Sequence, residues 1–165
     1  MHKHKGFTIV EMLGAIIILS IAATIIALTV SFIINANKRI IENGQANTTG
    51  TILIRQIEND ANDLFITRYE FIENESLILY SDYEYVFDDI SNQIEKNEFD
   101  QPLVLSIIFN SSELWINNEI YALSPFILHE TSTIEMVSDK RFLITIVLAS
   151  DNQTYTFKTS IETNE

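Results

Sequence analysis

The stretch Lys5-Gly6-Phe7-Thr8-Ile9-Val10-Glu11 opens the segment that decides the fold, because a run without any charged residue follows it from Met12 to Ile34. At about 1.5 Å per helical residue this run reaches about 35 Å, more than the hydrocarbon thickness of about 30 Å in a typical bilayer. A secretory signal peptide has a shorter apolar core and a small-residue cleavage site after it, and no such site follows here. The run therefore predicts a transmembrane helix.

The charges around the apolar run predict its orientation. Four basic or titratable residues precede it, namely His2, Lys3, His4 and Lys5. Positive charge favours the cytoplasmic side of a membrane, and Lys38 and Arg39 beyond the run weaken this bias without reversing it. We expect a single-pass protein of the cell membrane with a cytoplasmic N-terminus. The rest of the chain would then lie outside, in the periplasm or at the cell surface.

Glu11 is the one carboxylate at the start of the apolar run. A carboxylate at the centre of a bilayer costs about 2.5–3.5 kcal/mol on insertion scales, and less near the interface. A structural explanation is that Glu11 lies at the headgroup boundary, where the first turn of a helix favours negative charge. The functional alternative is that Glu11 awaits a positively charged partner.

Lys-Gly-Phe-Thr-Ile-Val-Glu followed by a long apolar helix resembles the class III leader of type IV pilins and pseudopilins. The resemblance implies that prepilin peptidase, a membrane aspartic peptidase, cuts between Gly6 and Phe7 and that the new amine of Phe7 is N-methylated. The family glutamate at the fifth position after the cut corresponds to Glu11. In the family it pairs with the terminal amine of a neighbouring subunit and sets axial register. Such a pair is stronger among helices than in water.

The resemblance also implies partners: prepilin peptidase, other pilin or pseudopilin subunits, and the inner or cytoplasmic membrane. Major pilins commonly carry a proline in the membrane helix, and Met12 to Ile34 has none. This departure, the lack of cysteine and the acidic remainder of the chain favour a minor pseudopilin that acts in filament assembly. We expect a structural protein and no enzyme.

Charge and composition exclude several other classes of function. From Glu42 onward the chain has six Lys/Arg against 22 Asp/Glu, a formal net charge of −16, which disfavours direct contact with nucleic acid. The absence of cysteine excludes thiol chemistry and Cys-based metal sites. There are only four glycines and no phosphate-binding glycine-rich loop, so we expect no nucleotide and no other cofactor.

The choice of machine rests on composition alone. Abundant Ile, Asn, Phe and Tyr suggest an AT-rich bacterial genome, which favours a competence (DNA-uptake) pseudopilus over type II secretion. The rival hypothesis is a monomeric, signal-anchored binding module outside the cytoplasm, for which Gly6 and Glu11 would be dispensable. A membrane-anchored hydrolase is disfavoured, because His129 is the only histidine outside the leader.

The organisation of the chain follows from these assignments. We expect a leader at 1–6, a transmembrane and polymerisation helix at 7–34, a helical stem at 35–64 and a β-rich domain at 65–165. Asn and Gly are poor helix formers, so the stem should be weak between 35 and 50. Beyond it a stripe of helical spacing predicts the packed face of the stem, formed by Ile54, Ile57, Ala61 and Leu64.

Residues after Leu64 alternate with the period of strands. We predict strands at 65–72, 76–80, 83–87, 103–109, 113–116, 119–123, 126–129, 133–137, 141–149 and 154–161, with 141–149 central. Residues 91–99 are polar and predict a short helix or loop, and Pro102 and Pro125 mark strand starts. Asn117 and Asn118 suit a two-residue hairpin turn. The sum is an α+β fold: a long N-terminal helix packed on an antiparallel sheet domain.

Three groups of residues remain as candidates for chemistry. His129 lies at a strand end, where we expect a structural role. The carboxylates Asp82, Glu84, Asp88 and Asp89 form the densest acidic cluster, but they lack the glycine-punctuated spacing of a calcium loop. We predict no metal site, and calcium binding by this cluster stays open. Trp115, Tyr121 and Phe126 are either a surface patch or core, and strand spacing favours core.

Overall fold

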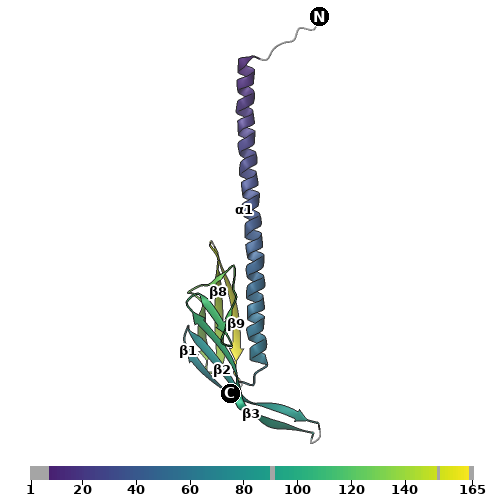
Figure 1. The fold of residues 1–165 in the computed structure, drawn as a ribbon, viewed down its shortest axis with the longest axis vertical. Helices are drawn as coiled ribbons and strands as arrows, with labels where there is room; N and C mark the ends of the chain where they lie inside the picture. The colour runs from purple at the N-terminus through teal and green to yellow at the C-terminus, as the bar shows by residue number, and fades with distance from the viewer. Residues whose placement is uncertain (1–7, 90–91, 152, 164–165) are drawn as a thin grey trace. The chain divides into compact units, whose positions relative to one another are not determined.

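The computed structural model describes residues 8–89, 92–151 and 153–163. It confirms the predicted α+β class, with one long helix followed by antiparallel strands (Figure 1). The chain divides into two units, one ending at Gly44 and the other spanning Gln45–Glu165. The second unit contains the end of the helix and all of the strands.

The helix α1 spans Ile9–Asn62 without interruption. The expectation of a weak helix between 35 and 50 is therefore wrong as far as backbone structure is concerned, since Gly44 and Gly50 are both helical. Tertiary packing overrides intrinsic propensity here, because Ala46 and Gly50 are buried against the strands. Small residues at these positions let the backbone of the helix come close to the sheet.

The first sheet is a meander with the strand order β1-β2-β3-β4-β5, and every neighbouring pair is antiparallel. Its strands are β1 (Arg68–Ile72), β2 (Ser76–Asp88), β3 (Gln93–Asn110), β4 (Glu113–Ile116) and β5 (Glu119–Tyr121). The two longest strands, β2 and β3, form a hairpin that extends past the other three. A bulge after Ser81 divides this hairpin into a proximal and a distal part.

The second sheet is built around β8 (Arg141–Ala149). This strand pairs with β6 (Ile127–Leu128), β7 (Thr133–Ser138) and β9 (Thr154–Glu162), always antiparallel. The predicted central position of 141–149 is thereby confirmed. Its run of apolar residues fits, since Phe142, Ile144, Ile146 and Leu148 are fully or almost fully buried.

One hydrophobic core joins the end of α1 to the inner faces of both sheets. The helix contributes a stripe of Ala46, Gly50, Leu53, Ile57 and Ala61. Of the predicted stripe, Ile57 and Ala61 are buried, whereas Ile54 and Leu64 are only partly buried against the core. The two sheets meet at Phe142, whose ring lies 4.9 Å from that of Tyr69 and 5.5 Å from that of Phe71.

At Gly50 the helix packs closely against Phe157 of β9. A methyl group built on Gly50 would overlap the ring of Phe157. Nearby, the hydroxyl of Thr159 on β9 donates a 2.7 Å hydrogen bond to the carboxylate of Glu58 on α1. The contact between α1 and β9 therefore combines the packing of the Phe157 ring against Gly50 with the hydrogen bond from Thr159 to Glu58.

Most strand predictions agree with the structure, and the exceptions lie in the β2–β3 hairpin. The predicted strands 76–80 and 83–87 are one strand, and the predicted loop or helix at 91–99 is strand from Gln93 onward. Pro102 lies inside β3 rather than at its start, within the bulged residues 99–102, which have no paired residue on β2. Asn117 and Asn118 both have positive φ, of 53° and 64°, and form the predicted hairpin turn.

Replacing Gly50 with alanine should destabilise the second unit. The added methyl group must displace the ring of Phe157, and overpacking of this kind costs about 1–3 kcal/mol. That loss outweighs the gain of about 1 kcal/mol in helix propensity. Urea unfolding of the full chain in detergent, followed by the fluorescence of the single tryptophan, Trp115, measures the change.

Gly44→Ala is the matched control, because nothing lies within 4 Å of a methyl group at Gly44. This variant should be as stable as the parent or more stable by up to about 1 kcal/mol. Adding Phe157→Leu to Gly50→Ala should recover part of the lost stability. Equal stability of Gly50→Ala and Gly44→Ala would contradict the close packing.

Candidate functional site

The first turn of α1 positions Glu11 through a reciprocal set of hydrogen bonds with Thr8. The backbone N–H and the hydroxyl of Thr8 donate to Oε2 of Glu11, at 2.9 and 3.0 Å. The backbone N–H of Glu11 donates in turn to the hydroxyl of Thr8 at 3.3 Å. This is a capping box, in which a threonine before the helix and a glutamate three residues later satisfy two otherwise unpaired N–H groups.

The sequence Thr8-Ile9-Val10-Glu11 has the capping-box pattern. The sequence-based interpretation of Glu11 did not include it. It gives Glu11 a local reason to be at the start of an apolar helix. Of the two carboxylate oxygens of Glu11, only Oε2 has a hydrogen bond within the described residues. Glu11 also lines an apolar hollow on the helix surface, together with Met12, Ala15, Ile16 and Leu19. Gly6 and Phe7, the predicted processing residues, lie outside the described residues.

The helix after Glu11 has the surface of a membrane segment. Its large apolar side chains are exposed, Leu19 and Phe32 among them at 74% each. Its hydroxyl groups bond within the helix: Ser20, Thr24 and Thr29 each donate at 2.8 Å to the carbonyl oxygen four residues earlier. Polar groups satisfied in this way are compatible with lipid. Within the described chain α1 is long and apolar enough to span a membrane.

Asp82 is held at the base of the distal β2–β3 hairpin. Its carboxylate accepts a 2.7 Å hydrogen bond from the hydroxyl of Thr67 and lies 3.3 Å from Nε of Arg68. The Thr67 bond, followed by the charge and hydrogen bond of Arg68, lowers the pKa of Asp82 below its ordinary range. The contact ties the segment between α1 and β1 to β2, just where the hairpin leaves the sheet.

The acidic cluster does not form a metal site in the described part of the chain. Asp82 bonds to Thr67, and Glu84 accepts a 3.1 Å hydrogen bond from the amide of Asn97. Asp88 and Asp89 lie at the far end of β2. No three His, Asp or Glu side chains among the described residues come together as metal ligands.

The remaining candidates have structural positions. His129 is half-buried after β6, and its Nδ1 lies 2.8 Å from the hydroxyl of Thr131. Phe126 is buried in the core and packs against Tyr155. Tyr121 is half-buried against the core. Trp115 is half-buried, and its Nε1 donates to Glu113 at 3.2 Å.

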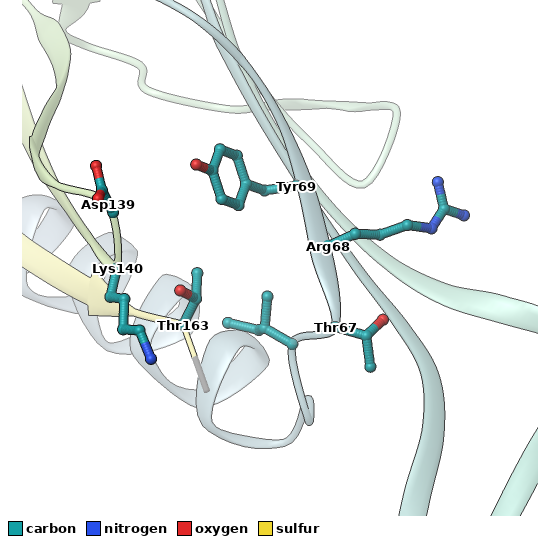
Figure 2. A pocket seen from close by; sticks show the side chains of 7 residues that line it. Thr67, Arg68, Tyr69, Asp139, Lys140 and Thr163 are labelled. Atoms are coloured by element: carbon teal, nitrogen blue, oxygen red, sulfur yellow. The ribbon is translucent and has the colours of Figure 1, made fainter. Parts of the chain in front are cut away.

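A pocket of about 180 Å³ lies between the start of β1 and the turn before β8. Figure 2 shows Lys140, Asp139 and Thr163 on one side of it and Tyr69 on the other, while Arg68 points away from it. The Arg68 side chain instead pairs with Asp82 and covers the ring of Tyr80 at 3.9 Å. Two of the lining residues, Thr67 and Arg68, thus bind the carboxylate of Asp82.

Removing the hydroxyl of Thr8 should loosen the first turn of α1. In Thr8→Val the N–H of Glu11 loses its acceptor, and loss of an N-cap costs about 1 kcal/mol. Amide hydrogen exchange at Glu11, measured by NMR in detergent micelles, should become about fivefold faster. Thr8→Ser keeps the hydroxyl and should exchange at the parent rate. An unchanged rate in Thr8→Val would contradict the capping box.

Asp82→Asn should change the pH dependence of stability. A carboxyl group with a lowered pKa stabilises the fold above the unfolded pKa of about 4, and this contribution is lost as pH falls through the folded pKa. The parent should therefore exceed Asp82→Asn in stability at neutral pH, and the difference should shrink in acid. Urea midpoints from pH 7 down to pH 3 measure it. Glu130→Gln, an exposed carboxylate elsewhere, is the control; a difference for Asp82→Asn that does not vary with pH would contradict the assignment.

Comparison with known proteins finds a family match for the N-terminal segment only. Residues 1–27 match the family described as the prokaryotic N-terminal methylation motif. No curated protein and no solved structure matches the chain. The matched segment contains Gly6, Phe7, Thr8 and Glu11 and the start of the exposed apolar helix. The N-terminal segment thus combines a methylation motif with the start of a helix that is long and apolar enough to span a membrane.

Proposed function

We propose that this chain is a minor pseudopilin that assembles into a type IV filament machine. The match of residues 1–27 to the methylation motif carries this proposal. Prepilin peptidase cuts between Gly6 and Phe7 and leaves an N-methylated Phe7. The segment 7–34 then holds the subunit first in the membrane and afterwards among other pilin or pseudopilin helices. Pilin-like proteins are structural subunits, and we propose a structural role for this chain as well.

Glu11 is proposed to pair with the terminal amine of a neighbouring subunit. Two observations support this role: Oε1 has no hydrogen bond among the described residues, and the carboxylate lines an apolar hollow. Once neighbouring helices pack around this hollow, an ion pair with Glu11 would be stronger than the same pair in water. The capping box does not compete with this pair, because it uses the other carboxylate oxygen.

The proposed machine is a DNA-uptake pseudopilus rather than a type II secretion filament, on composition alone. The chain itself is not proposed to contact DNA, since its acidic second unit would repel phosphate groups. In this proposal the N-terminus is cytoplasmic and the second unit is outside the cytoplasmic membrane, as the leading lysines favour.

The alternative is a monomeric anchored module, and the capping box is the observation in its favour. A glutamate that completes a helix cap has a reason to be at position 11 without any partner. The two functions differ in what Glu11 must be. A cap needs a hydrogen-bond acceptor, whereas an ion pair needs a negative charge.

Glu11→Gln separates these two roles. Glutamine serves in a capping box as glutamate does, but it has no charge. For the proposed function, incorporation into the filament should fall by about tenfold or more, because the amine of the neighbour loses its partner. Thr8→Val, which keeps the charge and loses the cap, should incorporate far better than Glu11→Gln. Quantitative blotting of sheared filaments against membranes measures both; equal incorporation of Glu11→Gln and the parent would favour the anchored module.

Intact mass and N-terminal sequencing of the chain from native membranes test the processing step. The expected chain begins at N-methylated Phe7. Gly6→Val should remain uncut while still inserting in the membrane, because the peptidase recognises the residue before the cut. A parent chain that begins at Met1 in cells that contain the peptidase would exclude the pilin pathway.

A further inference from the structure

The distal part of the β2–β3 hairpin is an arm that leaves the body of the second unit. We call residues 82–89 and 92–99 the arm. It starts where the register jumps from the pair Ser81–Leu103 to the pair Tyr83–Glu98, so that residues 99–102 form a bulge. Beyond this point β2 and β3 pair with each other and with no other described strand. Figure 1 shows the arm extending past the end of α1.

One face of the arm is aromatic and continues the inner face of the sheet. Directly paired residues share a face, which places Tyr83, Tyr85, Phe87 and Ile94 together. Phe65, just after α1, packs against the first two, with ring centroids 5.3 and 5.2 Å away. Helix α1 ends at Asn62, so the inner face of the sheet loses its helical cover before the arm begins. Tyr85, Phe87 and Ile94 are 55%, 54% and 71% exposed.

The opposite face of the arm is acidic. Glu84, Asp88 and Glu95 lie there with Val86, Gln93 and Asn97. Over residues 82–99 there are six carboxylates and one lysine. That lysine, Lys96, lies on the aromatic face, 4.0 Å from the ring centroid of Tyr83 and 2.7 Å from the carboxylate of Glu98. The acidic character of the arm is thus concentrated on one side of a thin, two-stranded ribbon.

We propose that the arm is a docking surface for a partner protein that presents an apolar strip flanked by Lys and Arg. The aromatic face requires an apolar partner surface, because a two-stranded ribbon cannot bury its own side chains. The acidic face selects the charge of that partner through electrostatic complementarity. Aromatic side chains on a protruding element are also the anchors that protein interfaces use most.

The charge of the chain argues against other occupants. A second copy would bring another strongly acidic unit, since the chain from Glu42 onward has a net charge of −16. An anionic lipid surface or a nucleic acid would be repelled by the same carboxylates. A different protein with a basic surface satisfies both faces at once. This inference goes beyond the proposed filament function and does not require it.

Site-specific photocrosslinking in native membranes tests the docking surface. The full chain carries p-benzoylphenylalanine at Phe87, or at Ile120 as control, which is 55% exposed on β5. We expect an adduct with a different protein at Phe87 and about tenfold less at Ile120. Mass spectrometry of the joined peptides should locate the contact beside Lys or Arg of the partner.

Charge variants decide whether the adduct is specific. Glu84→Lys with Glu95→Lys should lower its yield by about tenfold or more, because like charges then face each other. Glu84→Gln with Glu95→Gln removes the charges without reversing them and should lower the adduct yield by an intermediate amount. This variant shows whether the loss arises from charge and not from misfolding of the lysine variant. Glu73→Lys with Glu130→Lys makes the same charge change at exposed positions outside the arm and should leave the yield unchanged.

Several outcomes would overturn the proposal. They are an adduct between two copies of the chain, an adduct with lipid alone, equal yields at Phe87 and Ile120, or a yield that does not respond to the arm charges. In the last two cases the acidic face would serve only to keep an exposed strand edge from aggregating. Sequencing the N-terminus of the same samples separates this result from the filament proposal, since a chain starting at Phe7 can lack a docked arm.

Discussion

The seating of α1 on the inner faces of both sheets is the contact on which the second unit depends. Leu53 and Ile57 are fully buried there, and Gly50 admits the ring of Phe157 from β9. The strands form two sheets that meet at Phe142, and the buried residues of the helix belong to the same core. One uninterrupted helix thus has two kinds of surface: exposed apolar side chains before Gly44 and a single buried stripe after it. Its sequence serves lipid in one part and a protein core in the other.

In the proposed function Glu11 satisfies a local and an intermolecular requirement together. A helix that begins near a membrane interface must satisfy its first N–H groups, and Thr8 with Glu11 does so within one turn. A carboxylate has more acceptor positions than this cap uses. The cap also fixes the direction of the carboxylate, which lowers the entropy cost of binding a cation from outside. A preformed cap and a proposed ion pair therefore support each other.

The sequence predicted the parts of the fold whose burial follows a simple period. Such predictions were correct for the apolar helix and for the strand 141–149. The hairpin turn was predicted from the preference of Asn117 and Asn118 for positive φ. Two features were not. Ala46 and Gly50 belong to the core because they are small, and a search for large apolar residues passes over them. Residues 93–99 are polar enough to resemble a loop, since β pairing in the arm buries almost none of their side chains on either face. Long-range pairing with β2, not local preference, makes this segment a strand.

The arm follows from a mismatch in length between the helix and the hairpin. A sheet covered by a helix buries its inner face only as far as the helix extends, and α1 ends before the arm begins. The apolar alternation of β2 nevertheless continues through Tyr83, Tyr85 and Phe87. A chain selected only for solubility would make both faces of such an extension polar. Here Glu84, Asp88 and Glu95 lie on one face and keep the free chain soluble, while the aromatic face, which also carries Lys96 and Glu98, stays accessible. A ribbon with one aromatic face and one acidic face is expected of a binding element. This arrangement is the physical reason for assigning the arm a partner.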